Sequence, residues 1–372
     1  MISRPGGRYS QRRPLKKKQE KALKDLARRI EARASGGDIT GAEEELRQGL
    51  QALQQGKGIE VPAPYLLGEL ITDIEGTVEG LKTGYEGLDK IISIPQGAIT
   101  IIGARPGHGK TTLQLNLLLN MLRAHPDKRF FFFSYEEAKK FIALKLIMNL
   151  AGVELNQEAN LGAYVNYFKE KRDQDFQDPD YQKIETGIQE YEELVNSGRL
   201  IVSDRTIPGE ELASLVGHLA RPGEVGAIFI DYIQKIPLKT PTGGQRYQEI
   251  KRVSELLLEQ AKTLDIPIIM GAQLTRPASK DKGSSKSDRI VRLENLRESV
   301  DIEQDANLVL GLYNESVAKM EEEDKEVKAR EVSLEVHILK NRAGIAGRKV
   351  TLTFEMPILR IKDRDKKAEQ GY

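Results

Sequence analysis

The segment from Gly103 to Thr112, Gly-Ala-Arg-Pro-Gly-His-Gly-Lys-Thr-Thr, constrains this chain more than any other feature. It follows an apolar run and precedes a helical pattern, which is the context of a phosphate-binding P-loop. In such a loop, backbone N–H groups of the turn and of the helix N-terminus face phosphate oxygens. The segment therefore predicts a nucleotide site formed by Arg105, Pro106, Gly107, His108, Gly109, Lys110, Thr111 and Thr112.

Individual roles follow from the P-loop pattern. Lys110 is expected to reach the β- and γ-phosphates, and the Thr111 hydroxyl is expected to bind Mg²⁺. The strict pattern begins with Gly, whereas this chain has Ala104, which the turn tolerates if its φ angle is negative. A dinucleotide site is rejected, because Lys110 and Thr111 follow directly and no suitably placed acid ends a second strand.

Two carboxylates come directly after apolar runs. Asp231 ends the run Ala227–Asp231, the second half of a P-loop site, where the carboxylate holds the magnesium shell. Glu136 follows the run that contains Phe130–Phe133 and precedes Glu137. Because it comes first off that strand, we predict that Glu136 polarises the attacking water. The alternative is a helix N-terminal Glu that complements the helix dipole.

Apolar runs alternate with helical patterns from about residue 80 onward. Predicted strands are Ala98–Ala104, Arg129–Tyr135, Leu200–Ser203, Ala227–Tyr232, Pro267–Gln273, Leu308–Tyr313, Leu334–Leu339, Val350–Phe354 and Ile358–Ile361. Predicted helices include Thr112–Arg123, Glu136–Leu150, Pro208–Leu219 and Tyr247–Leu264. This alternation predicts an α/β fold with a mostly parallel sheet and helices on both faces. The last strands lack intervening helices, which predicts an antiparallel C-terminal extension.

Composition narrows the class of protein. The 372 residues contain no Cys, which excludes a disulfide scaffold and fits a reducing compartment. No apolar run reaches the roughly 18 residues of a membrane span, and the basic N-terminus has no apolar h-region after it. A soluble, cytoplasmic protein without membrane contact is expected.

The N-terminal region is basic and helical. Residues 1–30 hold eleven Lys and Arg against two acidic residues, a charge of +9 that leaves −8 for the rest of a chain whose net charge is +1. Helices are expected over Lys16–Ala34 and Thr40–Gln55, as an appendage too small to bury a core alone. A nucleic-acid or acidic partner for the arm and a merely solvated tail remain alternatives. The expected organisation is a basic arm with helices at 1–61, a linker at 62–80, an ATPase domain at 81–363 and a tail at 364–372.

Several further short motifs accompany the P-loop in a fixed order along the chain. In chain order the set is Thr83-Gly84-Tyr85 with Leu88-Asp89, the P-loop, Ser134-Tyr135-Glu136, Ile230-Asp231-Tyr232-Ile233-Gln234, Gln273-Leu274-Thr275-Arg276, Leu296-Arg297-Glu298-Ser299 with Ile302–Ala306, and Lys340-Asn341-Arg342. Over roughly residues 80–363 this set resembles the RecA-like motor domain of the DnaB-type replicative helicases. The resemblance implies a RecA-like P-loop NTPase core that uses ATP and Mg²⁺.

The resemblance also implies site roles and partners. Gln273 matches the residue that senses the γ-phosphate, and Lys340 and Arg342 match a pair that reaches into the neighbouring subunit's ATP site. An Arg supplied in trans stabilises charge that builds on the γ-phosphate, which makes Arg342 the expected arginine finger. The family implies a hexameric ring that translocates on single-stranded DNA as a helicase.

Two basic loops leave strands that bear site residues, Lys239–Arg246 and Pro277–Arg292. Flexible basic loops track phosphates without reading bases, so DNA contact is predicted for Arg246, Lys280, Lys282, Lys286 and Arg289. The alternative is that these loops are exposed to solvent and do not contact DNA.

The chain departs from the family in two places. The family carries a larger globular helical N-terminal domain, whereas about 80 residues that include basic helices stand here. A replication or loader protein is a candidate partner of the basic arm. His108 stands where the family usually has Met, and packing or solvent exposure is expected for it. Two functional alternatives stay open: a DNA-stimulated ATPase that remodels a nucleoprotein complex without unwinding, and an adaptor ring controlled by ATP.

Overall fold

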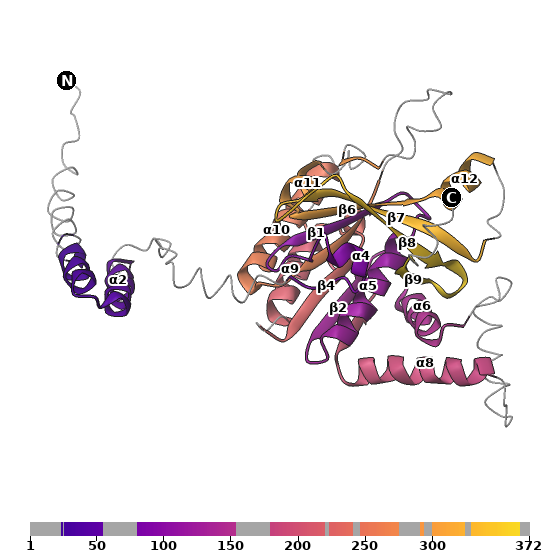
Figure 1. Cartoon of the computed structure of the whole chain (residues 1–372), viewed down its shortest axis with the longest axis horizontal. Helices are drawn as coiled ribbons and strands as arrows, with labels where there is room; N and C mark the ends of the chain where they lie inside the picture. The colour runs from indigo at the N-terminus through magenta and orange to yellow at the C-terminus, as the bar shows by residue number, and fades with distance from the viewer. Residues whose placement is uncertain are drawn as a thin grey trace, which may run out of the picture. The chain divides into compact units, whose positions relative to one another are not determined.

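The computed structural model describes residues 24, 26–54, 80–153, 179–219, 223–240, 246–274, 291–293, 300–323 and 329–364. The chain divides into two compact units, Met1–Val78 and Glu79–Tyr372 (Figure 1). Each unit has its own buried residues and is described by itself. Among the described residues, no helix combines the length and apolar character that crossing a bilayer requires.

The N-terminal unit contains two helices, as predicted. Residues 26–35 are helical, and α2 spans Ile39–Gln54. The first helix ends at Gly36-Gly37, where Gly37 has φ 82° and the left-handed backbone that favours glycine at a helix end. Asp38 then starts α2, since its Oδ1 accepts the backbone N–H of Gly41 at 2.9 Å. Ion pairs from Arg29 and Arg33 to Glu45, at 2.9 and 2.7 Å, join the two helices.

The second unit is built on one nine-stranded sheet in the order β3-β2-β4-β5-β1-β6-β7-β8-β9. The strands are β1 Ile99–Ala104, β2 Arg129–Ser134, β3 Leu200–Ser203, β4 Val225–Asp231, β5 Ile268–Gln273, β6 Leu308–Asn314, β7 Glu331–Asn341, β8 Lys349–Glu355 and β9 Arg360–Asp363. The first six pair in parallel, and β7, β8 and β9 continue the sheet antiparallel. Both the parallel body and the antiparallel extension are confirmed.

Helices cover both faces of this sheet (Figure 1). They are α4 Glu86–Asp89, α5 Lys110–Ala124, α6 Lys139–Ala151, α8 Pro179–Asn196, α9 Gly209–Leu219, α10 Arg246–Leu264, α11 Val300–Asp305 and α12 Glu315–Glu323. The run Phe130–Phe133 explains how the sheet serves two cores. Successive strand side chains point to opposite faces, so Phe130 and Phe132 pack with α5 and α6, while Phe131 and Phe133 pack with α9 and α10.

Two helical features differ from the sequence expectation. Helix α6 begins at Lys139, three residues later than predicted, because the Ser134 side chain holds residues 134–137 in a turn: its Oγ accepts the Glu137 N–H at 3.1 Å and donates to the Glu137 carbonyl at 2.6 Å. Helix α8 was not predicted. Tyr191 and Leu194 of this helix pack against the core, Ile184 is buried, and Gly187 lets the helix approach Ala151 closely.

Candidate nucleotide-binding site

The P-loop joins the C-terminal end of β1 to the start of α5. Gly107 and Gly109 have φ angles of 76° and 92°, a conformation that only glycine adopts without strain. Ala104 is not among the residues with positive φ, so the condition for replacing the first glycine of the pattern is met. Gly109 is the residue that precedes α5, and the first backbone N–H groups of that helix are available to an anion.

Lys110, Thr111 and Asp231 meet at the C-terminal ends of β1 and β4. The Thr111 hydroxyl donates to Asp231 Oδ2 at 2.5 Å, and Lys110 Nζ lies 3.1 Å from Asp231 Oδ1. Asp231 is fully buried, and the Lys110 ammonium is the cation beside its Oδ1. A carboxylate without solvent is costly unless a cation balances it, and Lys110 provides that charge. The sequence prediction that these three residues share one site is therefore matched by their positions.

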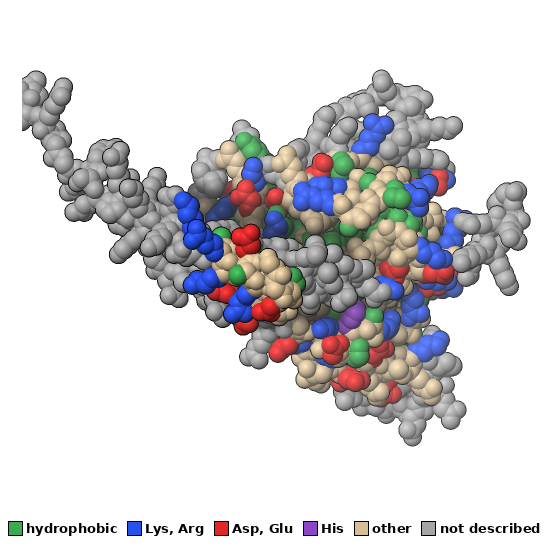
Figure 2. All heavy atoms as spheres, turned by 60° about the vertical axis from the view of Figure 1, so that its left-hand side comes forward, with side chains coloured by type: hydrophobic (Ala, Val, Ile, Leu, Met, Phe, Trp, Pro, Cys, Tyr) green, Lys and Arg blue, Asp and Glu red, His purple; other side chains and the backbone are tan. Residues whose placement is uncertain are grey.

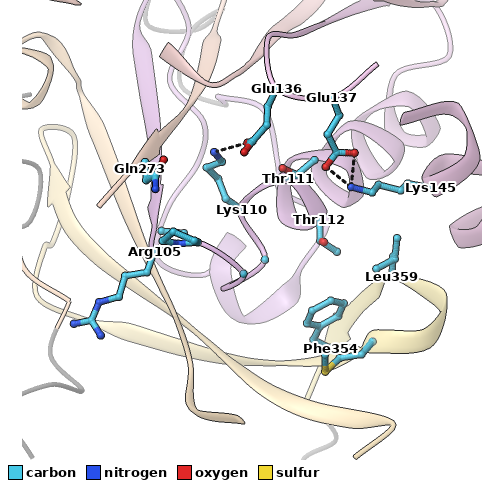
Figure 3. Close-up of a pocket in the computed structure, with 15 residues that line it drawn as sticks. Arg105, Lys110, Thr111, Thr112, Glu136, Glu137, Lys145, Gln273, Phe354 and Leu359 are labelled. Atoms are coloured by element: carbon cyan, nitrogen blue, oxygen red, sulfur yellow. Dashed lines mark hydrogen bonds and ion pairs between the residues drawn. The ribbon is translucent and has the colours of Figure 1, made fainter. Parts of the chain in front are cut away.

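The Lys110 ammonium group also contacts residues that follow two other strands. Its Nζ lies 3.5 Å from Glu136 Oε2 (Figure 3) and 3.7 Å from the centre of the Tyr232 ring. Glycine at position 271 makes room for this cluster, because a Cβ there would lie 3.0 Å from both Asp231 Oδ1 and the Lys110 Cδ. The aliphatic part of Lys110 thus packs over β5 while its charge reaches the carboxylates.

Glu136 and Glu137 separate into two environments. Glu136 points toward Lys110, and Glu137 accepts two contacts from Lys145 Nζ at 2.5 and 2.6 Å (Figure 3). Both glutamates precede α6, whose first backbone N–H is accepted by Asp204 at 3.0 Å. That bond lowers the pKa of Asp204. Glu136 therefore precedes the first turn of α6, and its catalytic and helix-dipole roles stay open as alternatives.

The ends of β1 and β5, the segment after β2 and the P-loop border a pocket of about 370 Å³. Its lining is Ala104, Arg105, Pro106, Gly107, Gly109, Lys110, Thr111, Thr112, Glu136, Glu137, Lys145, Gln273, Phe354, Met356 and Leu359. Sequence reasoning missed Lys145 and the apolar wall of Phe354, Met356 and Leu359 (Figure 3). These apolar residues lie more than 240 positions after the P-loop, and no local pattern connects the two segments.

A buried hydrogen-bond network fixes that wall against the P-loop helix. Asn116 Nδ2 donates to the carbonyls of Thr112 and Leu359 at 2.8 and 2.9 Å. Its Oδ1 accepts Asn149 Nδ2 at 3.0 Å and the backbone N–H of Ile361 at 2.9 Å. Asn149 Nδ2 donates in addition to the Leu359 carbonyl at 2.8 Å. Asn116 thereby uses its full capacity of two donors and two acceptors.

Gln273 is in the pocket, as the sequence predicted, because β5 pairs with β1 so that Gln273 lies beside Ala104. Its backbone is clamped by the Gln234 amide, which accepts the Gln273 N–H and donates to the Gln273 carbonyl, both at 3.2 Å. The segment after β4 and the end of β5 are thus connected directly.

Lys340 and Arg342 lie outside the pocket lining and contact the end of α11. Lys340 Nζ donates to the Glu303 carbonyl at 2.5 Å, and Arg342 donates to the Gln304 carbonyl at 2.6 Å. Burial lowers the pKa of Lys340, and the neighbouring Arg342 charge adds to this. Cations at a helix C-terminus satisfy its last carbonyls. The pair is therefore held by the end of α11 in its own chain and does not line its own pocket, so its role at a neighbour's site stays a prediction.

The structure shows the surroundings of two further predicted residues, His108 and Arg246. His108 is buried and does not line the pocket, although its loop neighbours do, so packing is the alternative that holds. Arg246 donates to the carbonyls of Gln234 and Ile236, both at 2.8 Å. Lys280, Lys282, Lys286 and Arg289 lie outside the described residues, and their DNA contact stays a prediction. On the face that Figure 2 shows, the described basic and acidic side chains are intermixed.

Comparison with known proteins agrees with this geometry. Residues 80–363 match the family described as the DnaB-like helicase C-terminal domain. The replicative DNA helicase DnaB of Mycoplasma pneumoniae is 29% identical over 303 residues, 78% of this chain and 58% of that protein. A probable plasmid replicative DNA helicase of Chlamydia muridarum is 32% identical over 235 residues, 62% of this chain and 46% of that protein.

Solved structures show the same fold. One of them, an ATPase domain, superposes with a TM-score of 0.62 at 23% identity, over 80% of this chain and 96% of that one. A DnaB-like replicative helicase, solved in a study of its interactions with primase, gives 0.63 at 23% identity, over 93% of this chain and 76% of that one. The chain spans 46–64% of the length of the first curated relatives it matches. By the match over residues 80–363, the chain belongs to the family of the DnaB-like helicase C-terminal domain.

Proposed function

We propose that this chain is an ATP-hydrolysing DNA helicase that assembles into a ring and translocates on single-stranded DNA. The observation that carries the proposal is that Lys110, Thr111 and Glu136 line one pocket, with buried Asp231 in contact with Lys110 and Thr111, within the segment that matches the family. Lys110 neutralises phosphate charge, and Glu136 accepts a proton from the attacking water. Glu136 is half-exposed at the pocket edge, where water reaches it.

The donor set fits Mg²⁺. The Thr111 hydroxyl and the Asp231 carboxylate are hard oxygen donors of the kind that Mg²⁺ prefers, and they lie in direct contact with each other. Thr111 and Asp231 would hold the ion, Asp231 through water. When bound, Mg²⁺ neutralises charge on the β- and γ-phosphates. The residues of the chain would orient the substrate: the P-loop N–H groups would bind phosphate oxygens, and Gln273, which lines the pocket, would contact the γ-phosphate.

The apolar wall accounts for the other end of the nucleotide. Phe354, Met356 and Leu359 offer the pocket an aromatic ring and two aliphatic surfaces. Nucleobases stack on such surfaces, so we assign this wall to the base of ATP. Asn116 on α5, the helix that follows the P-loop, fixes the position of this apolar wall by its hydrogen bond to the Leu359 carbonyl.

Hydrolysis is proposed to occur between subunits. Arg342 contacts the end of α11 in its own chain and lies outside its own pocket lining, which supports the proposal that it serves the pocket of a neighbour. A site completed by the next copy requires a head-to-tail contact, and such contacts close into rings. The family resemblance favours six subunits. A replication or loader protein is the proposed partner of the basic N-terminal arm.

The first test measures ATP hydrolysis with and without single-stranded DNA, strand displacement on a forked duplex, and native mass, for wild type and Glu136→Gln. A ring with DNA-stimulated hydrolysis and unwinding, both lost in Glu136→Gln, supports the proposal. Stimulated hydrolysis without unwinding would favour a remodelling ATPase. Hydrolysis that is indifferent to DNA would favour an adaptor ring.

Subunit mixing tests the arginine finger. Glu136→Gln and Arg342→Ala are each expected to be inactive alone. In mixed rings, some sites combine the intact Glu136 of an Arg342→Ala subunit with the intact Arg342 of a neighbouring Glu136→Gln subunit. These sites are complete, so activity is expected to return in part. No recovery in demonstrably mixed rings would refute hydrolysis in trans. Arg348→Ala, an exposed Arg on the same hairpin, is the matched control and is expected to stay active.

A further inference from the structure

His108 lies at the centre of the P-loop between two glycines with left-handed backbone. Gly107 and Gly109 have φ angles of 76° and 92°, and glycines give a loop little conformational preference of its own. The His108 side chain is fully buried, whereas both glycines line the pocket. The side chain therefore points away from the nucleotide and anchors the middle of the loop in the protein interior.

The anchor is a specific hydrogen bond. His108 Nδ1 accepts the backbone N–H of Asn314 at 3.0 Å, and its ring lies 5.8 Å from that of Tyr313. Both residues end β6, which pairs directly with β1, the strand that leads into the P-loop. An Nδ1 that accepts a hydrogen bond carries no proton, so this contact requires the neutral imidazole with its proton on Nε2.

Asn314 also starts the next helix. Its side chain is fully buried, and its Oδ1 accepts the backbone N–H groups of Ser316 and Val317 at 3.1 and 3.3 Å, which is an N-cap of α12. A Cβ placed on Gly107 would lie 3.5 Å from Val317 Cγ1, so the first turn of α12 also borders the P-loop. The loop and the start of α12 thus contact each other at two points.

We propose that His108 is a positioning residue: through Asn314 it holds the P-loop in its phosphate-binding conformation and ties that conformation to the N-terminus of α12. The proposal rests on nucleotide binding in the proposed function. The physical basis is preorganisation. A glycine-rich loop that is already fixed loses less conformational freedom when phosphates bind, and this raises affinity without any contact to the ligand.

The experiment measures ATP affinity calorimetrically with Mg²⁺ in the Glu136→Gln background, so that turnover does not interfere. His108→Leu removes the acceptor and is expected to weaken ATP binding about tenfold, which is about 1.4 kcal/mol. His108→Asn places an oxygen near the position of Nδ1 and is expected to restore affinity to within about threefold of the parent, less than about 0.7 kcal/mol. Val216→Ala is the matched control, because Val216 is a buried α9 residue outside the pocket lining.

The link to α12 is tested in the same assay. Asn314→Ala removes the cap and is expected to weaken ATP binding, whereas Asn314→Asp keeps an acceptor oxygen and binds like the parent. Parent-like affinity in His108→Leu, with only a lowered Tm as in Val216→Ala, would overturn the positioning role. Equal losses in His108→Leu and His108→Asn would overturn the hydrogen bond as its cause. A parent that binds no ATP at all would instead refute the proposed function, and this proposal with it.

Discussion

Replacing Asn116 by Leu removes a fully used hydrogen-bonding side chain and keeps the number and branching of its heavy atoms. Two donors lose their acceptor: the backbone N–H of Ile361 on edge strand β9, and one N–H of Asn149. The Leu359 carbonyl keeps its bond from Asn149, so it is not orphaned. Each buried orphan donor costs about 1–3 kcal/mol, so the free energy of unfolding is expected to fall by about 2–6 kcal/mol. At about 2–4 °C per kcal/mol, Tm falls by about 5–20 °C.

Urea and thermal unfolding followed by circular dichroism measure this loss. The control is Asn120→Ala on the same helix, which removes a single bond to the Thr83 carbonyl at 3.0 Å and is expected to cost about 1 kcal/mol. Because the Leu359 carbonyl is also held by Asn116, the Leu variant is further expected to raise the KM for ATP in the folded enzyme. An Asn116→Leu protein no less stable than Asn120→Ala would refute the reasoning.

Three further predictions concern other parts of the chain. Phe354→Ala is expected to raise the KM for ATP about tenfold, which is about 1.4 kcal/mol, with kcat little changed. The reason is that Phe354 is assigned to the base of ATP and not to its γ-phosphate. Steady-state kinetics measure both constants, and a fall in kcat alone would contradict the prediction. Burial lowers the pKa of His337 from its usual 6.5. The stability that neutral His337 contributes is therefore present above pH 6.5 and is lost as the pH falls through the folded-state pKa. In His337→Asn, the free energy of unfolding is expected to fall less between neutral and mildly acidic pH. Alanine at Lys280, Lys282 and Lys286 together is expected to weaken single-strand binding and reduce its salt slope, and an unchanged slope would count against these lysines.

Most of the sheet and most of the pocket lining were predictable from local signals and from the family resemblance. Continuous apolar runs such as Phe130–Phe133 indicate strands that are buried on both faces, and all nine predicted strands are present with shifts of a few residues at their ends. The P-loop spacing and the terminal positions of Asp231 and Glu136 predict their meeting, because parallel strands end at one edge of a sheet. Helix α8 was within reach of the same periodicity argument and was missed.

The sequence by itself determined the parallel α/β core, the P-loop chemistry and the family resemblance, because each depends on neighbours in the chain or on fixed spacings. Tertiary structure alone decided which distant groups complete the pocket. The wall of Phe354, Met356 and Leu359 reaches the P-loop helix through the antiparallel extension and the Asn116 network, and His108 is turned inward by a backbone N–H some two hundred residues away. Contacts over such separations leave no periodic trace, since they depend on the packing of elements and not on the order of residues within one element.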